Sequence, residues 1–211
     1  MRKGPLAVPS LAAAAALAAG VCAVPAQALT PSPVVVAQQS PGASLPTNVT
    51  LSLKSVGRFF PEVTRVVSVG PDRTAVGMPT ATVAVVYADP TGTRKVTISV
   101  DLYRTAPVAA TAFQQAAKAS RAVPGFTPLT TPRIGTATTG GIVTMGGETH
   151  IGIGVLDGRH AVGVTLAGYD ATPANTASLV ALVRAEVTAA DAVLGAATTP
   201  HSSQPAGIAE F

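Results

Sequence analysis

The chain has 211 residues, 14 Lys and Arg against 10 Asp and Glu, and a formal net charge of +4. It contains no Trp, 3 Tyr and 5 Phe, and beyond the N-terminus Arg94-Lys95 is its one pair of adjacent basic residues. A nucleic-acid partner needs a basic groove for its phosphates or an aromatic platform for its bases, so the composition excludes nucleic acid.

The N-terminus has the parts of a secretory signal peptide. Two basic residues precede an apolar run over residues 11–24, and Ala26 and Ala28 supply the small residues of a cleavage site. The pattern predicts a signal peptide over residues 1–28 and a secreted or periplasmic protein of the bacterial cell envelope. The apolar run is too short to span a bilayer, so we expect no transmembrane segment in the mature chain.

The single cysteine, Cys22, lies inside this segment. Lipid attachment to it would require a leucine-like residue three positions earlier, where Ala19 stands, so the sequence disfavours a lipoprotein anchor. Cleavage after Ala28 leaves a mature chain without cysteine. Core packing must then hold the fold without a disulfide.

Composition divides the mature chain into three parts. Residues 29–47 are rich in Pro, Ser and Gln and predict a flexible tether. Residues 48–195 carry the regular apolar patterns of a single folded domain, and residues 196–211 have too few apolar residues to fold and predict a disordered tail.

The first half of the domain predicts a short helix, a strand and a hairpin. The helix ends at Pro61, the strand covers residues 64–69, and residues 82–88 and 95–103 alternate around turn residues. The second strand of the hairpin has an aliphatic face and a polar face, and the polar residues are Thr97, Ser99, Asp101 and Tyr103.

A helix over residues 107–122 follows, with Thr105 as its expected N-cap. Its apolar face, expected to pack on a sheet, comprises Val108, Ala109, Ala112, Phe113, Ala116 and Ala117. Strands are then expected over residues 133–138, 141–145, 148–156 and 159–168, and a last helix over residues 172–194. Together the elements predict an α+β domain: a largely antiparallel sheet of about six strands with two or three helices packed on it.

The hairpin around Asp157-Gly158 brings acids and histidines close in sequence. Because Asp-Gly favours a type I′ turn, we expect Leu156 to face Arg159 and Val155 to face His160. Side chains alternate between faces, so His160 joins the aliphatic face and His150 the opposite one. The two imidazoles then cannot share a metal ion, and we expect no metal site and no cofactor.

Glu148 and His150 remain together on one face. They form either a solvated pair or two ligands of an incomplete metal site. On the same face, Gly152, Gly154 and Gly163 leave a strip without side chains next to Thr165. Either a helix packs across this strip or a ligand or partner lies on it. These six residues are the candidate binding residues.

Three strings accompany this order of elements: DLYRT (101–105), AFQQA (112–116) and IGTAT (134–138). With them the chain resembles small secreted α+β modules of actinobacteria, namely PsbP-like modules and the extracellular sensor domains of bacterial receptor kinases. The resemblance implies an α+β fold and a sensor-like role, and it identifies no functional residue.

No nucleophile elbow and no Ser-x-x-Lys motif occurs in the sequence. Catalysis is therefore disfavoured, and the first hypothesis is a non-catalytic module of the cell envelope that binds a small apolar ligand or an envelope protein. A hydrolase or metal-dependent enzyme that uses Glu148 and His150 is an alternative hypothesis. A structural envelope protein is a further one.

Overall fold

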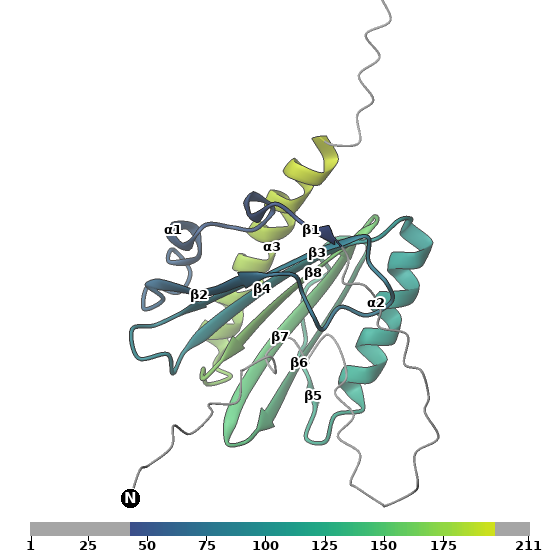
Figure 1. The fold of residues 1–211 in the computed structure, drawn as a ribbon. Helices are drawn as coiled ribbons and strands as arrows, with labels where there is room; N and C mark the ends of the chain where they lie inside the picture. Colours follow the sequence, from purple (N-terminus) through teal and green to yellow (C-terminus); the bar gives the residue numbers. More distant parts are fainter. Residues whose placement is uncertain (1–42, 197–211) are drawn as a thin grey trace, which may run out of the picture.

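The structure, a computed structural model, describes residues 43–196, which form one mostly antiparallel sheet with helices on both faces (Figure 1). The strands of the described part are β1 Ala43–Ser44, β2 Arg65–Gly70, β3 Ala81–Ala88, β4 Lys95–Leu102, β5 Thr127–Pro128, β6 Ala137–Met145, β7 Glu148–Asp157 and β8 His160–Ala167. The helices there are the 3-10 helix η2 Thr47–Val49 and the α-helices α1 Leu53–Val56, α2 Ala106–Arg121 and α3 Pro173–Ala196.

The predicted α+β class is confirmed, and the sheet has eight strands where about six were expected. Two of the eight, β1 and β5, are only two residues long, which is too short to leave an alternating pattern in the sequence.

The strand expected over residues 133–138 begins later than predicted, because a turn precedes it. The backbone N–H and C=O of Ile134 both bond to the hydroxyl of Thr138, and Gly135 has a φ of 60°. The two strands expected over 133–145 are therefore a single strand, β6.

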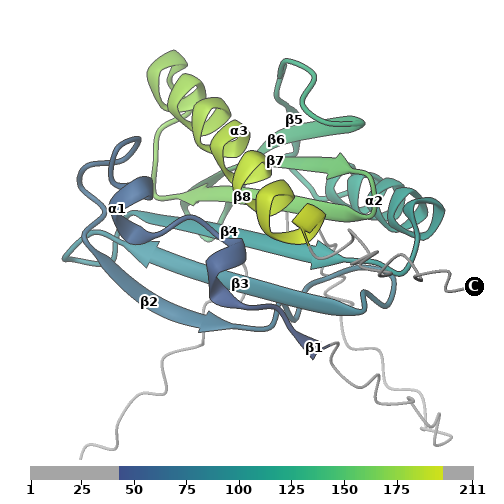
Figure 2. The same cartoon turned by 90° about the horizontal axis from the view of Figure 1, so that it is seen from above.

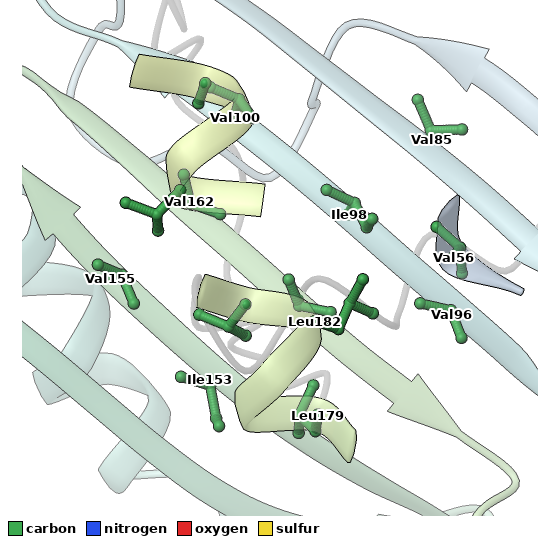
Figure 3. Packing of buried hydrophobic residues seen from close by; sticks show 14 of the residues in the cluster. Val56, Val85, Val96, Ile98, Val100, Ile153, Val155, Val162, Leu179 and Leu182 are labelled. Carbon is green, nitrogen blue, oxygen red and sulfur yellow. The ribbon is translucent and has the colours of Figure 1, made fainter. Parts of the chain in front are cut away.

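The sheet order is β1-β3-β4-β8-β7-β6-β5, with β2 paired to the outer edge of β3. The last strand, β8, lies between β4 and β7 at the centre. One face of these strands is aliphatic, and α3 packs across it on β7 and β8 (Figure 2). In Figure 3, Leu179 and Leu182 of α3 lie over the valine and isoleucine side chains of β4, β7 and β8. This face is the hydrophobic core.

Helix α2 covers the opposite face of β6, β7 and β8. Thr105 caps it as expected, since its hydroxyl accepts a hydrogen bond from the N–H of Val108. The expected apolar face is only partly correct, because Ala109 and Ala112 are buried but the side chain of Val108 is 44% exposed. The contact of α2 with the sheet is thus made mostly by alanine.

The register of the β7–β8 hairpin differs from the expected one by two residues. Asp157 pairs with His160 and Val155 with Val162, so the loop consists of Gly158 and Arg159. Only the first of these two has a positive φ, which is the pattern of a type II′ turn with glycine in first place. A shift of two residues preserves the faces, so His150 and His160 still project from opposite sides of the sheet.

Residues 43–47 fall within the predicted tether, yet Ala43 and Ser44 pair with β3 and Leu45 is buried. The predicted signal peptide, most of the tether and nearly all of the predicted tail lie outside the described residues. No helix formed by residues 43–196 is long and apolar enough to cross a membrane.

A carboxyl group is buried in the aliphatic core. Glu186 of α3 has no exposed surface, and its Oε2 accepts a hydrogen bond of 2.9 Å from the N–H of Leu51. The carbonyl of Leu51 in turn accepts a hydrogen bond from the hydroxyl of Tyr87. Glu186 therefore fastens the segment before α1 to α3. Burial raises the pKa of Glu186 to about 7 from 4.5, and the Leu51 hydrogen bond opposes part of that rise.

We predict that Glu186→Gln removes a pH dependence of stability. A carboxyl whose pKa rises on folding stabilises the fold when protonated, so this contribution is complete below 4.5 and is lost as the pH rises to about 7. The lost free energy is about 3 kcal/mol. Urea unfolding measures the free energy of unfolding at each pH. As the pH rises across this range, that of the variant should increase relative to that of the wild type by this amount. Glu62→Gln, at a partly exposed carboxyl, is the control, and equal pH profiles for wild type and Glu186→Gln would contradict the assignment.

Candidate functional site

A cavity of about 60 Å³ lies between α2 and the sheet. The strand register brings its floor together: Gly154 pairs with Gly163, and Gly152 pairs with Thr165. All four of these predicted binding residues line the cavity. The glycine strip is therefore covered by a helix, as one of the two alternatives expected, and a cavity lies between the strip and that helix.

One wall of the cavity is polar and comes from β4. This strand pairs with β8 in a register that sets Thr97 beside Thr165, Ser99 beside Gly163 and Asp101 beside Ala161. These β4 side chains alternate toward α2 and line the cavity. The polar face of β4 thus continues directly into the glycine strip of β8 and β7.

Two polar atoms in this wall are shielded from solvent and have no hydrogen-bond partner among the described residues. They are the Oγ1 of Thr97 and the Oδ1 of Asp101. Burial, and then the nearby carboxyl of Asp72, raise the pKa of Asp101 well above 3.8. Buried polar groups without a partner are rare in folded proteins and call for an explanation.

Aromatic rings close the cavity from the helix side. A Cβ on Gly154 would lie 3.4 Å from Cε2 of Phe113, which is an ordinary contact. A Cβ on Gly141 would lie 2.1 Å from Cε2 of Phe126, so that ring occupies the place of a side chain. Phe126 follows α2 and lies over β6, where it covers one end of the cavity.

The segment over residues 72–76 closes the other end, near Asp101. Its turn is held by Oδ1 of Asp72, which accepts hydrogen bonds from the N–H and the hydroxyl of Thr74. The hydroxyl of Tyr103 donates a hydrogen bond of 2.8 Å to the carbonyl of Val76. Burial and the nearby carboxyl of Asp101 raise the pKa of Tyr103, so this hydroxyl keeps its proton.

Glu148 and His150, the other predicted binding residues, lie on the same face but do not line the cavity. Nε2 of His150 is 3.7 Å from Oε2 of Glu148. The expectation of a solvated pair is wrong for the imidazole, because His150 is 3% exposed and its Nδ1 has no hydrogen-bond partner within residues 43–196. His150 lies in the row of residues beyond Gly152, where it pairs with Val143 on one side and Ala167 on the other.

A metal-dependent enzyme that uses Glu148 and His150 would need at least a third ligand for its metal ion. Within the described part of the chain, no three His, Cys, Asp or Glu residues are grouped so that they could hold a metal ion. On the aliphatic face, Nε2 of His160 lies 3.1 Å from Oδ1 of Asp191 in α3, without hydrogen-bond geometry. His160 thus contacts α3 at the margin of the core.

Sequence patterns did not identify Asp101, Thr97 and Phe126 as lining residues of a site. The alternation of β4 places the first two on its polar face, which is a visible signal. Their position beside the glycine strip depends on the pairing of β4 with β8, strands that are separated by α2, β5, β6 and β7 in the chain. No local pattern encodes that pairing.

Comparisons with known proteins show little similarity. No protein-family model matches the chain, and no curated protein matches it. Among solved structures it is similar to the extracellular domain of PknH from Mycobacterium tuberculosis, with 15% sequence identity and a TM-score of 0.48. The match covers 66% of this chain and 93% of that domain. This neighbour is a receptor-kinase extracellular domain, as one part of the expected resemblance suggested, whereas the PsbP-like part stays a prediction.

We predict that Glu148→Gln lowers the pKa of His150. Burial holds this pKa below its ordinary value of 6.5, and the carboxylate of Glu148 opposes that shift. Removing the carboxylate should move the pKa further down and leave that of His160, on the other face, unchanged. A pH titration of the imidazole C–H resonances by NMR measures both. An unchanged His150 titration would show that the two side chains are not in contact.

Proposed function

We propose that this protein is a non-catalytic binding module that holds a small ligand in the cavity between α2 and the sheet. The observation that carries the proposal is the pair of unpartnered, shielded polar atoms in the cavity wall, on Thr97 and Asp101. Such atoms are costly to bury alone, and a ligand that bonds to either of them removes part of that cost.

The shape of the cavity supports a small ligand. Glycine backbone at Gly152, Gly154 and Gly163 forms its floor, and aromatic and alanine side chains form its roof. One buried water needs roughly 10–15 Å³ of such space, so the cavity takes a group of about four to six heavy atoms. This size corresponds to a small ligand or to one end of a longer one.

We also propose that the protein acts outside the cytoplasm, as a sensor-like or binding component of the bacterial cell envelope. This part rests on the predicted signal peptide over residues 1–28 and on the expected absence of cysteine from the mature chain. Binding by Gly152, Gly154, Gly163 and Thr165 is the role proposed for the predicted site residues, and Glu148 and His150 are not part of it.

We predict that Gly154→Ala weakens ligand binding about tenfold without unfolding the protein. Its methyl group would enter the cavity at an ordinary contact distance of 3.4 Å from Phe113 and Thr139. Alanine is also favoured over glycine within a strand, by roughly 0.5–1 kcal/mol. The measurement is NMR of the amides lining the cavity during titration with neutral, cationic and anionic compounds of about four to six heavy atoms.

Gly70→Ala is the matched control, because a Cβ there would meet no atom within 4 Å and Gly70 is outside the cavity. Compounds that bind the wild type should bind this variant equally well. If no compound of any charge shifts the cavity amides of the wild type, the cavity is not a binding site and the proposed function is wrong.

A further inference from the structure

The charges around the cavity all have one sign. Two carboxyl groups line it, those of Asp72 and Asp101, and no Lys, Arg or His is among its lining residues. Both carboxyls lie at the end that the 72–76 segment closes. An anionic ligand would disfavour ionisation of both carboxyls there, whereas a cation would favour it and be attracted to the carboxylates that form.

The Oδ1 atoms of the two carboxyls differ in the number of hydrogen bonds that they accept. Oδ1 of Asp72 accepts two hydrogen bonds from Thr74, at 2.8 and 2.6 Å. Oδ1 of Asp101 is shielded from solvent and accepts none from the described residues. A carboxylate accepts hydrogen bonds and donates none, so the natural partner of a buried one is a charged N–H group. Oδ1 of Asp101 has no such partner within residues 43–196.

The rest of the cavity suits the body of an organic cation. Phe113 and Phe126 line it with aromatic rings, which pack against alkyl groups. Thr97 lies four residues from Asp101 along β4, about 13 Å away, so its free hydroxyl marks the opposite end. An ammonium at Asp101 would therefore have a short apolar chain extending over the glycine floor toward Thr97.

We propose that the cavity binds a small organic ammonium ion, or the ammonium end of a longer molecule, with the carboxylate of Asp101 as its counter-ion. This inference rests on the proposed function, because it names the ligand class of the same cavity. Asp101 binds the ammonium directly, Asp72 adds a second negative charge nearby, and the alkyl body lies along the glycine floor beneath α2.

The state of Asp101 without ligand is consistent with this role. Burial and Asp72 raise its pKa well above 3.8, because its ionised form has no partner in the empty cavity. A bound ammonium supplies the missing opposite charge and favours ionisation. Asparagine imitates the protonated carboxyl in size, so Asp101→Asn should fold while losing the charge.

The test uses three compounds of matched size: butylammonium, butan-1-ol and butyrate. Each compound is titrated into the mature chain, residues 29–211, at constant ionic strength. The amide shifts of Gly152, Gly154 and Gly163 are followed by NMR. We expect butylammonium to bind with a Kd on the order of 1 mM, butan-1-ol at least tenfold more weakly, and butyrate not at all. Asp101→Asn should weaken butylammonium at least tenfold and leave butan-1-ol unchanged.

Asp170→Asn is the matched control, since it removes one carboxylate from an exposed position outside the cavity. It should leave all three affinities unchanged. If butan-1-ol binds as tightly as butylammonium and Asp101→Asn changes neither, the cation proposal is wrong and the proposed function stands. If Asp101→Asn and Asp170→Asn weaken butylammonium binding equally, the effect comes from the net charge of the protein. The role of Asp101 as counter-ion is then wrong. Binding by none of the three compounds would overturn both proposals.

Discussion

The strands β4, β8 and β7 are buried on both faces, and the two faces have different chemistry. Toward α3 they present branched aliphatic side chains that interlock with leucines and valines. Toward α2 they present glycine, alanine and short hydroxyl residues, and only Tyr103, Ala109, Ala112 and Leu156 form a buried apolar cluster there. Free energy of burial grows with the apolar area removed from water, so the α3 side contributes more to stability than the α2 side. Helix α2 is the more weakly held layer, and it is the one that covers the cavity.

Local patterns in the sequence predicted much of this fold. Alternation and turn residues located the hairpins, and Thr105 and Thr172 marked the starts of the two long helices, where both hydroxyls accept hydrogen bonds from the backbone. Local patterns failed where a distant contact decides the structure. The two-residue strand β1 exists only because β3 offers it an edge, and residues 133–136 leave the extended conformation because Thr138 bonds back to Ile134.

For the candidate site, too, local patterns predicted the part that lies within one hairpin and not the part that depends on distant strands. Alternation within one hairpin placed Gly152, Gly154 and Gly163 on a face without side chains, and it separated His150 from His160 even though the register was wrong by two residues. That separation survived because it depends only on the even or odd spacing of positions. The polar half of the cavity required the order of strands, which the chain sets by passing through a helix and three strands before β8 returns to β4. The sequence shows Asp101 but not its neighbours.

Two carboxyl groups on opposite sides of the sheet, the buried Glu186 and the half-buried Asp101, have different surroundings. Glu186, in the apolar stripe of α3, accepts the N–H of Leu51 with its Oε2 and so ties two segments together, while its Oε1 is shielded and has no hydrogen-bond partner within residues 43–196. Asp101 is bordered by empty space and has a shielded oxygen without a partner in the described chain. The proposed ligand would supply the partner that Oδ1 of Asp101 lacks among the described residues, and the two carboxyls that line the cavity would favour a cation.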